Sequence, residues 1–184
     1  TLRLIKKHKG LSIDVLDIPF EDEVFNEIYA KGNTNSIFQF ESTGMKNMLI
    51  RFKPTCFEDI ILLNAAYRPG PMQYLDNIID IKNGVKEMSF KTPKLKNILS
   101  NTYGSIIYQE QVMQICQELA GFSLGEADIV RRYMSKKKMD ALKKSENDFV
   151  YGNKEKGIKG CVNNGIDEQI AREIFSELTE FAKY

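Results

Sequence analysis

Residues 108–126 read YQEQVMQICQELAGFSLGE, and this stretch predicts two consecutive helices. Gly121 stands where a residue in the left-handed conformation commonly ends a helix. Ser123 and Glu126 then match a capping box, in which hydroxyl and carboxylate satisfy exposed N–H groups at the start of the next helix. The two helices should therefore meet in a tight corner that fixes their angle. The apolar residues of the first helix follow the 3.6-residue period: Val112, Ile115, Cys116 and Leu119.

Helix signals of the same kind extend through the rest of the chain. Thr55 and Glu58 match a second capping box, which predicts a helix beginning just after Thr55. Two short apolar runs, 36–40 and 105–108, are typical of brief strands or extended loops, and nothing supplies partners for a larger sheet. The expected fold class is mainly α, with short extended segments and loops. Further helices are expected over 21–31, 42–51, 74–82, 93–99, 139–156 and 167–184.

The glycine-rich stretch 157–165 suggests a division of the chain. Gly157, Gly160 and Gly165 surround two asparagines, a composition typical of a flexible joint. We expect residues 1–160 to form one domain core and residues 161–184 to begin a following helical subdomain that continues beyond this chain. Both ends of the chain fall within helical patterns, which suggests a piece of a longer protein.

The composition indicates a globular protein without a strong overall charge. The 184 residues are 42% hydrophobic, enough for a sizeable core, and 26 basic against 25 acidic residues leave a net charge of +1. Cys56, Cys116 and Cys161 lie far apart and His8 is the only histidine, so we expect no zinc site but buried thiols in a reducing cytoplasm. No apolar run approaches the ~20 residues that span a bilayer, so we expect no membrane partner.

Positive charge is concentrated between Arg131 and Lys144. This segment contains seven basic residues and one acid, Asp140, a local sum of +6. Lysine and arginine bind a nucleic acid by displacing counterions from its phosphates, and a solvated helix face is the alternative explanation. The candidate DNA-binding residues are Lys136, Lys137, Lys138, Lys143 and Lys144.

Two arginine positions are candidates for binding phosphate. The planar fork of an arginine holds two phosphate oxygens at once, which a lysine does not. Arg131 and Arg132 are adjacent and point about 100° apart on a helix, so only a bulky anion would engage both, and either one could instead pair with Glu126 or Asp128. Arg68 precedes Pro69-Gly70-Pro71, which restrict the backbone, although it could equally cap a helix end.

Gln109 and Gln111 place amide groups at the start of the Tyr108 helix, where capping is the structural alternative to ligand binding. No catalytic constellation accompanies these candidates. His8 has no Ser and Asp partners in a triad order, and there is no phosphate-binding glycine loop or close pair of aspartates at a strand end. We therefore nominate no catalytic residue and no metal ligand.

Six motifs carry a resemblance to a known family, and together they cover nearly the whole chain. In order and spacing they resemble the fingers region of the DNA polymerase III alpha subunit, the C-family bacterial replicase. Tyr133 and Ser135 depart from the Ala and Gly that the family more often has. The motifs are SIFQFESTGM (36–45), KPTCFEDI (53–60), YRPGP (67–71), YGSIIYQEQVMQI (103–115), LGEAD (124–128) and RRYMSKKK (131–138).

The resemblance implies a role in nucleotidyl transfer by the complete polymerase. In this family three palm aspartates, outside the present chain, hold two Mg²⁺ ions, and the fingers close over the incoming deoxynucleoside triphosphate (dNTP). It also implies template-primer DNA and the remaining polymerase domains as partners, with the sliding clamp and clamp loader bound through other regions. The implied nucleotide-binding residues are Arg131 and Arg132 first, then Arg68, Lys46, Gln109 and Gln111.

Two other classes of function remain open from the residues themselves. A free-standing helical nucleic-acid-binding module would use the same basic segment. A protein-interaction scaffold would leave the placement of the arginines unexplained.

Overall fold

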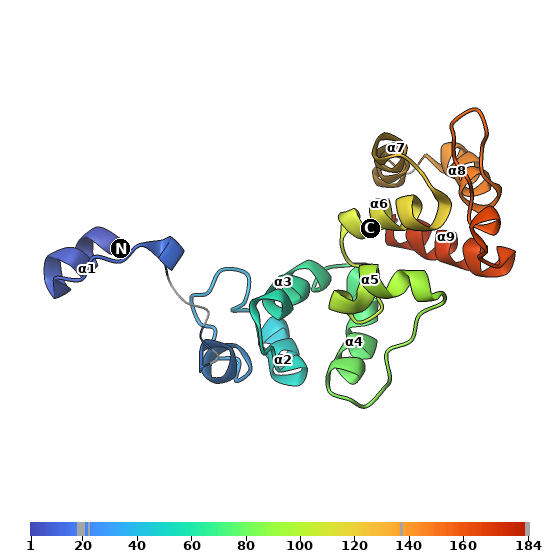
Figure 1. Ribbon diagram of the computed structural model, residues 1–184. Helices are drawn as coiled ribbons and strands as arrows, with labels where there is room; N and C mark the ends of the chain where they lie inside the picture. Colours follow the sequence, from blue (N-terminus) through green and yellow to red (C-terminus); the bar gives the residue numbers. More distant parts are fainter. Residues whose placement is uncertain (18–20, 22, 137, 183–184) are drawn as a thin grey trace. The chain divides into compact units, whose positions relative to one another are not determined.

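The computed structural model describes residues 1–17, 21, 23–136 and 138–182 (Figure 1). Their regular structure is helical, and the only β pairing among them is an isolated bridge between Asn153 and Ile158, which confirms the mainly α class. The α-helices are α1 (Leu2–Lys9), α2 (Thr43–Phe52), α3 (Phe57–Ala66), α4 (Leu75–Lys82), α5 (Lys96–Leu99), α6 (Gln109–Ala120), α7 (Leu124–Ser135), α8 (Met139–Tyr151) and α9 (Glu168–Ala182). A π-helix, η2 (Val24–Tyr29), and short 3₁₀ segments lie between them.

The chain divides into two compact units, Thr1–Ile60 and Ile61–Tyr184. In the first unit, the Ser42 hydroxyl accepts a hydrogen bond from the Met45 N–H at 3.3 Å and begins α2. This helix buries Met45, Leu49 and Phe52, which recur every three or four residues. Residues 36–40 form turns and not a strand, and Ser36 and Gln39 both have a positive φ.

The predicted capping box at Thr55 uses a different carboxylate from the expected one. Asp59 Oδ2 accepts hydrogen bonds from the Thr55 N–H at 2.8 Å and from the Thr55 hydroxyl at 3.1 Å. The helix begins at Phe57, so Asp59 lies one turn after Thr55 and reaches back to it. The expectation that Glu58 supplies the carboxylate is wrong.

In the second unit, the predicted corner between α6 and α7 is confirmed. Gly121 has φ 76°, and its N–H donates to the Gln117 carbonyl at 2.9 Å. Ser123 and Glu126 form the full capping box, with the Ser123 N–H donating to Glu126 Oε2 at 3.0 Å and the Glu126 N–H to Ser123 Oγ at 3.3 Å. The corner packs the two helices against each other.

One apolar core is shared by the five helices α5, α6, α7, α8 and α9. Its buried residues include Ile115 and Leu119 of α6, Phe149 of α8 and Leu178 of α9. Figure 1 shows α9 running beside α8 in this unit, and α9 also contacts α7. The helical face of 168–182 is therefore buried by the same core as the preceding helices. The domain boundary expected at 160/161 stays a prediction.

Residues 152–165 connect α8 to α9, and the flexible joint expected at 157–165 stays a prediction. The helix α8 ends at Tyr151, five residues before the expected end, because Gly152 turns the chain with φ 90°. Two backbone hydrogen bonds tie the returning loop to the helices. The Gly160 N–H donates to the Ala120 carbonyl and the Cys161 N–H to the Phe149 carbonyl, both at 2.8 Å.

Candidate functional site

Both candidate arginines of α7 bind one carboxylate. Arg131 donates to Asp128 Oδ1 from Nε at 2.9 Å and from Nη2 at 2.7 Å. Arg132 Nε lies 2.7 Å from the other oxygen, Oδ2. The spacing of three and four residues places all three side chains on neighbouring turns of the helix. Asp128, and not Glu126, is thus the partner of both arginines.

The two arginines differ in exposure and in remaining partners. The Arg131 side chain is 28% exposed, and its Nη1 donates to Gln109 Oε1 at the start of α6 at 3.0 Å. The Arg132 side chain is 64% exposed, and in the described part of the chain its two terminal nitrogens have no hydrogen-bond partner. Arg132 therefore presents free donors to solvent, while Arg131 links α7 to α6.

The arginine pair keeps the central carboxylate ionised. The hydrogen bond from Arg131, followed by the charge of Arg132, lowers the pKa of Asp128. One negative charge thus lies between two positive ones, and the cluster carries a net charge of about +1 near neutral pH. We name Asp128, Arg131, Arg132 and Gln109 the α7 cluster.

Gln111, another nucleotide-binding candidate, has a buried amide with four hydrogen bonds. Its Oε1 accepts from the N–H groups of Ile107 and Tyr108, both at 2.9 Å. Its Nε2 donates to the Ile98 carbonyl at 3.2 Å and to the Thr102 hydroxyl at 2.8 Å. The residue is 3% exposed, so it takes the capping role that the sequence also allowed.

The remaining nucleotide-binding candidates, Arg68 and Lys46, have surroundings of their own. Arg68 is exposed at the end of α3, and within the described residues its guanidinium has no hydrogen-bond or ion-pair partner. Lys46 belongs to the first unit, where its Nζ donates to Asn35 Oδ1 at 2.6 Å. Within the second unit, Arg68 is not joined to the arginine pair by a hydrogen bond in the residues described.

The candidate DNA-binding lysines surround the junction of α7 and α8. Lys136 follows the last residue of α7 and Lys138 precedes the first residue of α8, and both side chains are exposed. Lys143 and Lys144 are exposed on α8. Lys137 lies outside the described residues. The described lysines are exposed to solvent, as contact with the phosphates of DNA requires.

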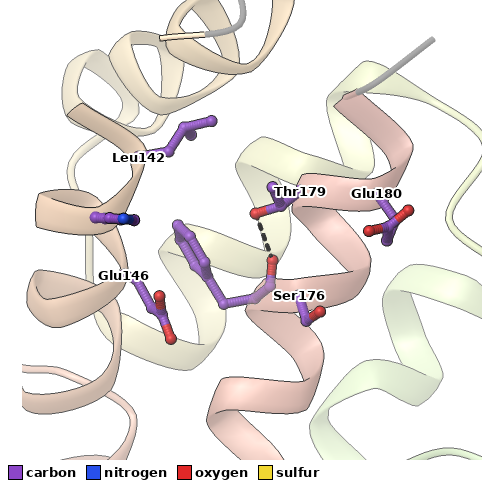
Figure 2. Close-up of a pocket in the computed structure, with 7 residues that line it drawn as sticks. Leu142, Glu146, Ser176, Thr179 and Glu180 are labelled. Atoms are coloured by element: carbon purple, nitrogen blue, oxygen red, sulfur yellow. Dashed lines mark hydrogen bonds between the residues drawn. The ribbon is translucent and has the colours of Figure 1, made fainter. Parts of the chain in front are cut away.

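A groove of about 300 Å³ lies between α8 and α9, and Figure 2 shows the side chains that line it from the two helices. Lys143 lines this groove together with the carboxylates of Glu146 and Glu180. These acids oppose the binding of a polyanion near Lys143.

The cysteines and acids of the described residues form no group of three that could hold a metal ion. Cys116 and Cys161 are buried, as expected, and burial raises the pKa of each thiol to about 12. Cys56 is only partly buried. Among the helices of the described chain, none combines the length and apolarity needed to cross a membrane.

Comparison with known proteins identifies the family. A family model for the bacterial DNA polymerase III alpha subunit finger domain matches residues 1–157. The chain belongs to this finger-domain family. It is also similar to curated relatives named DNA polymerase III subunit alpha, with 43% identity over 183 residues to the protein of Halalkalibacterium halodurans and 42% over 180 residues to that of Staphylococcus epidermidis. These matches cover 100% and 98% of this chain but 16% of each relative's length. The resemblance seen in the motifs is thereby confirmed for the finger domain.

The role of Asp128 in the α7 cluster of the finger domain is only partly indicated by the sequence. The sequence indicates Asp128 as one of two alternative partners for a single arginine, whereas the structure shows it bound to both. The signal was present in the spacing Asp-x-x-Arg-Arg, which puts an acid one turn before two bases on the same helix. The link between Arg131 and Gln109 joins residues 22 positions apart, and no local pattern indicates it.

Proposed function

We propose that this chain is the fingers segment of a replicative DNA-directed DNA polymerase, binding the triphosphate of the incoming dNTP beside template-primer DNA. Membership of the finger-domain family supports the general role. The exposed guanidinium of Arg132, next to Arg131 in the α7 cluster, is the observation that supports a triphosphate site. Preorganised cationic donors stabilise the charge that moves toward the departing pyrophosphate.

The chemistry of the reaction belongs to segments outside this chain. The chain spans 16% of the length of its relatives, and by resemblance the palm aspartates of the complete polymerase hold the Mg²⁺ ions. Mg²⁺ prefers carboxylate oxygens, which bind it beside the substrate phosphates. We therefore expect the isolated chain to catalyse no template-dependent incorporation. A cytoplasmic location and the clamp and clamp-loader partners remain proposals for the whole protein.

We propose that template-primer DNA contacts the exposed lysines at the α7–α8 junction. Lys136, Lys138 and Lys144 carry flexible ammonium groups that neutralise phosphates without reading bases. Such contacts position the duplex and depend strongly on salt. The arginine pair is more suited to the triphosphate, because its fork geometry matches two oxygens of one phosphate.

Single-turnover incorporation by the full-length polymerase, measured across dNTP concentrations, tests the triphosphate site. Arg131→Ala and Arg132→Ala should each weaken dNTP binding and slow incorporation, at least one of them by about 2–4 kcal/mol of transition-state stabilisation. Lysine at either position should restore only part of the loss, because it lacks the fork.

A matched control and a separate titration decide what the arginines bind. Arg3→Ala removes an exposed arginine from α1 and should leave the dissociation constant for dNTP and the maximal rate of incorporation near wild type. DNA affinity, measured without nucleotide, should change little in the α7 variants. If both α7 substitutions weaken DNA binding but leave dNTP affinity and rate unchanged, the pair clamps the DNA backbone and the proposed triphosphate site is wrong.

A further inference from the structure

We infer that Asp128 is a positioning residue of the proposed triphosphate site, which fixes the guanidinium groups of Arg131 and Arg132 in one orientation. The inference rests on the proposed function of this pair. Each carboxylate oxygen serves a different arginine: Oδ1 accepts twice from Arg131 and Oδ2 pairs with Arg132. One carboxylate thus sets the direction of two long side chains that would otherwise sample many rotamers.

The pattern of occupied donors leaves an outward-facing edge for an anion. Asp128 binds Arg132 through Nε, so the two terminal nitrogens of Arg132 stay without a partner among the described residues. Those terminal nitrogens form the end of the fork that meets phosphate oxygens. A phosphate can therefore bind Arg132 without displacing Asp128.

Gln109 completes the arrangement from a second helix. Its Oε1 accepts from Arg131 Nη1 at 3.0 Å, on the side of the guanidinium away from Nε. Gln109 is the first residue of α6, and the capped corner at Gly121 holds α6 against α7. Arg131 is thus fixed by one residue on its own helix and by one on its neighbour.

The negative charge of Asp128 has two opposing effects on a bound triphosphate. It offsets one of the two arginine charges, which weakens the attraction of the free site for any anion. It also preorganises the donors, which favours the geometry of the transition state. Removing the charge alone should therefore separate binding from rate: ground-state affinity for the nucleotide is kept or increased, while incorporation slows.

The test compares Asp128→Asn with wild type in the full-length polymerase by single-turnover incorporation across dNTP concentrations. The dissociation constant for dNTP should stay within about 3-fold of wild type or become smaller. The maximal rate should fall by about 10- to 100-fold, the scale expected when a reacting group is displaced by about an ångström. Asp128→Glu, which keeps the charge on a longer side chain, should recover part of the rate.

Two further variants serve as a charge control and as a test of the second partner of Arg131. Glu118→Gln also removes one negative charge, from an exposed site near the other end of α6, and should keep both constants at wild-type values. Gln109→Ala should lower the maximal rate by a few-fold, since Asp128 still holds Arg131. Far-ultraviolet circular dichroism of each variant checks that the fold is retained.

The outcomes separate this inference from the proposed function. If Arg132→Ala impairs dNTP binding while Asp128→Asn keeps the wild-type rate, the positioning role is wrong and the triphosphate site stands. If Asp128→Asn weakens dNTP and DNA binding together, the carboxylate is a general structural support and the inference also fails. If neither arginine affects dNTP affinity or rate, the proposed site itself is wrong.

Discussion

The backbone of Gly152 crosses that of Gly160 so closely that a Cβ on Gly160 would lie 2.3 Å from the Gly152 nitrogen. Gly152 ends α8 with φ 90°, and Gly160 has φ 84°. Their lack of side chains lets the returning loop place the Cys161 N–H 2.8 Å from the Phe149 carbonyl. This crossing connects α8 to the segment that leads into α9.

Replacing Gly160 by Ala should destabilise the chain by more than about 3 kcal/mol, because a left-handed conformation costs about 1–2 kcal/mol and the new methyl group meets backbone that cannot rotate away. Gly157→Ala is the matched control, since it also has a positive φ of 69° but no atom within 4 Å of the added Cβ. It should cost only about 1–2 kcal/mol. Urea denaturation measures both values, and equal losses would show that the crossing is not tight.

Gln111→Ala should destabilise the chain by about 2–4 kcal/mol, because one buried and one partly buried backbone N–H group lose their acceptor. These are the N–H groups of Ile107 and Tyr108, which lie just before α6. Gln114→Ala on the same helix is the control, since Gln114 is exposed and should change the free energy of unfolding by less than about 0.5 kcal/mol. A Gln111 variant as stable as the Gln114 variant would contradict the capping role.

Thiol labelling should distinguish Cys56 from the other two cysteines. Burial raises the pKa of Cys116 and Cys161 to about 12, so at pH 8 almost none of either is in the reactive thiolate form. Burial also raises the pKa of Cys56, but this thiol is only partly buried, so a disulfide reagent should reach it first and should modify all three thiols only after unfolding in urea. Cys56→Ser should abolish the fast phase. If two or more thiols of the folded chain reacted quickly, the buried positions of Cys116 and Cys161 would be contradicted.

The isolated chain should bind duplex DNA weakly, with little sequence preference and with an affinity that falls as salt rises. Lys136→Ala, Lys138→Ala and Lys144→Ala should each make the slope of log affinity against log salt shallower by about 0.9 if each lysine contacts one phosphate. Lys143→Ala should have a smaller effect because Glu146 and Glu180 line the same groove (Figure 2). Lys9→Ala, in α1, serves as the control. Binding that is unchanged at high salt would rule out these lysines as the DNA contacts.

The sequence by itself determined the elements that depend on local chemistry. The capping box of Ser123 and Glu126 and the left-handed Gly121 could be predicted because their hydrogen bonds join residues within one turn. The same reasoning chose Glu58 over Asp59 at Thr55, since the two acids are adjacent and only the observed start of α3 at Phe57 separates them.

Tertiary structure decided which polar side chains belong to a site and which support the fold. Gln109 and Gln111 are two residues apart in the same motif, yet one meets Arg131 on α7 and the other meets Thr102 and Ile98 in the interior. A helix turns about 200° between such positions, so their surroundings depend on which neighbours pack on each side. Those neighbours lie 9 to 22 residues away in sequence. Only the packing of α5, α6 and α7 brings them together.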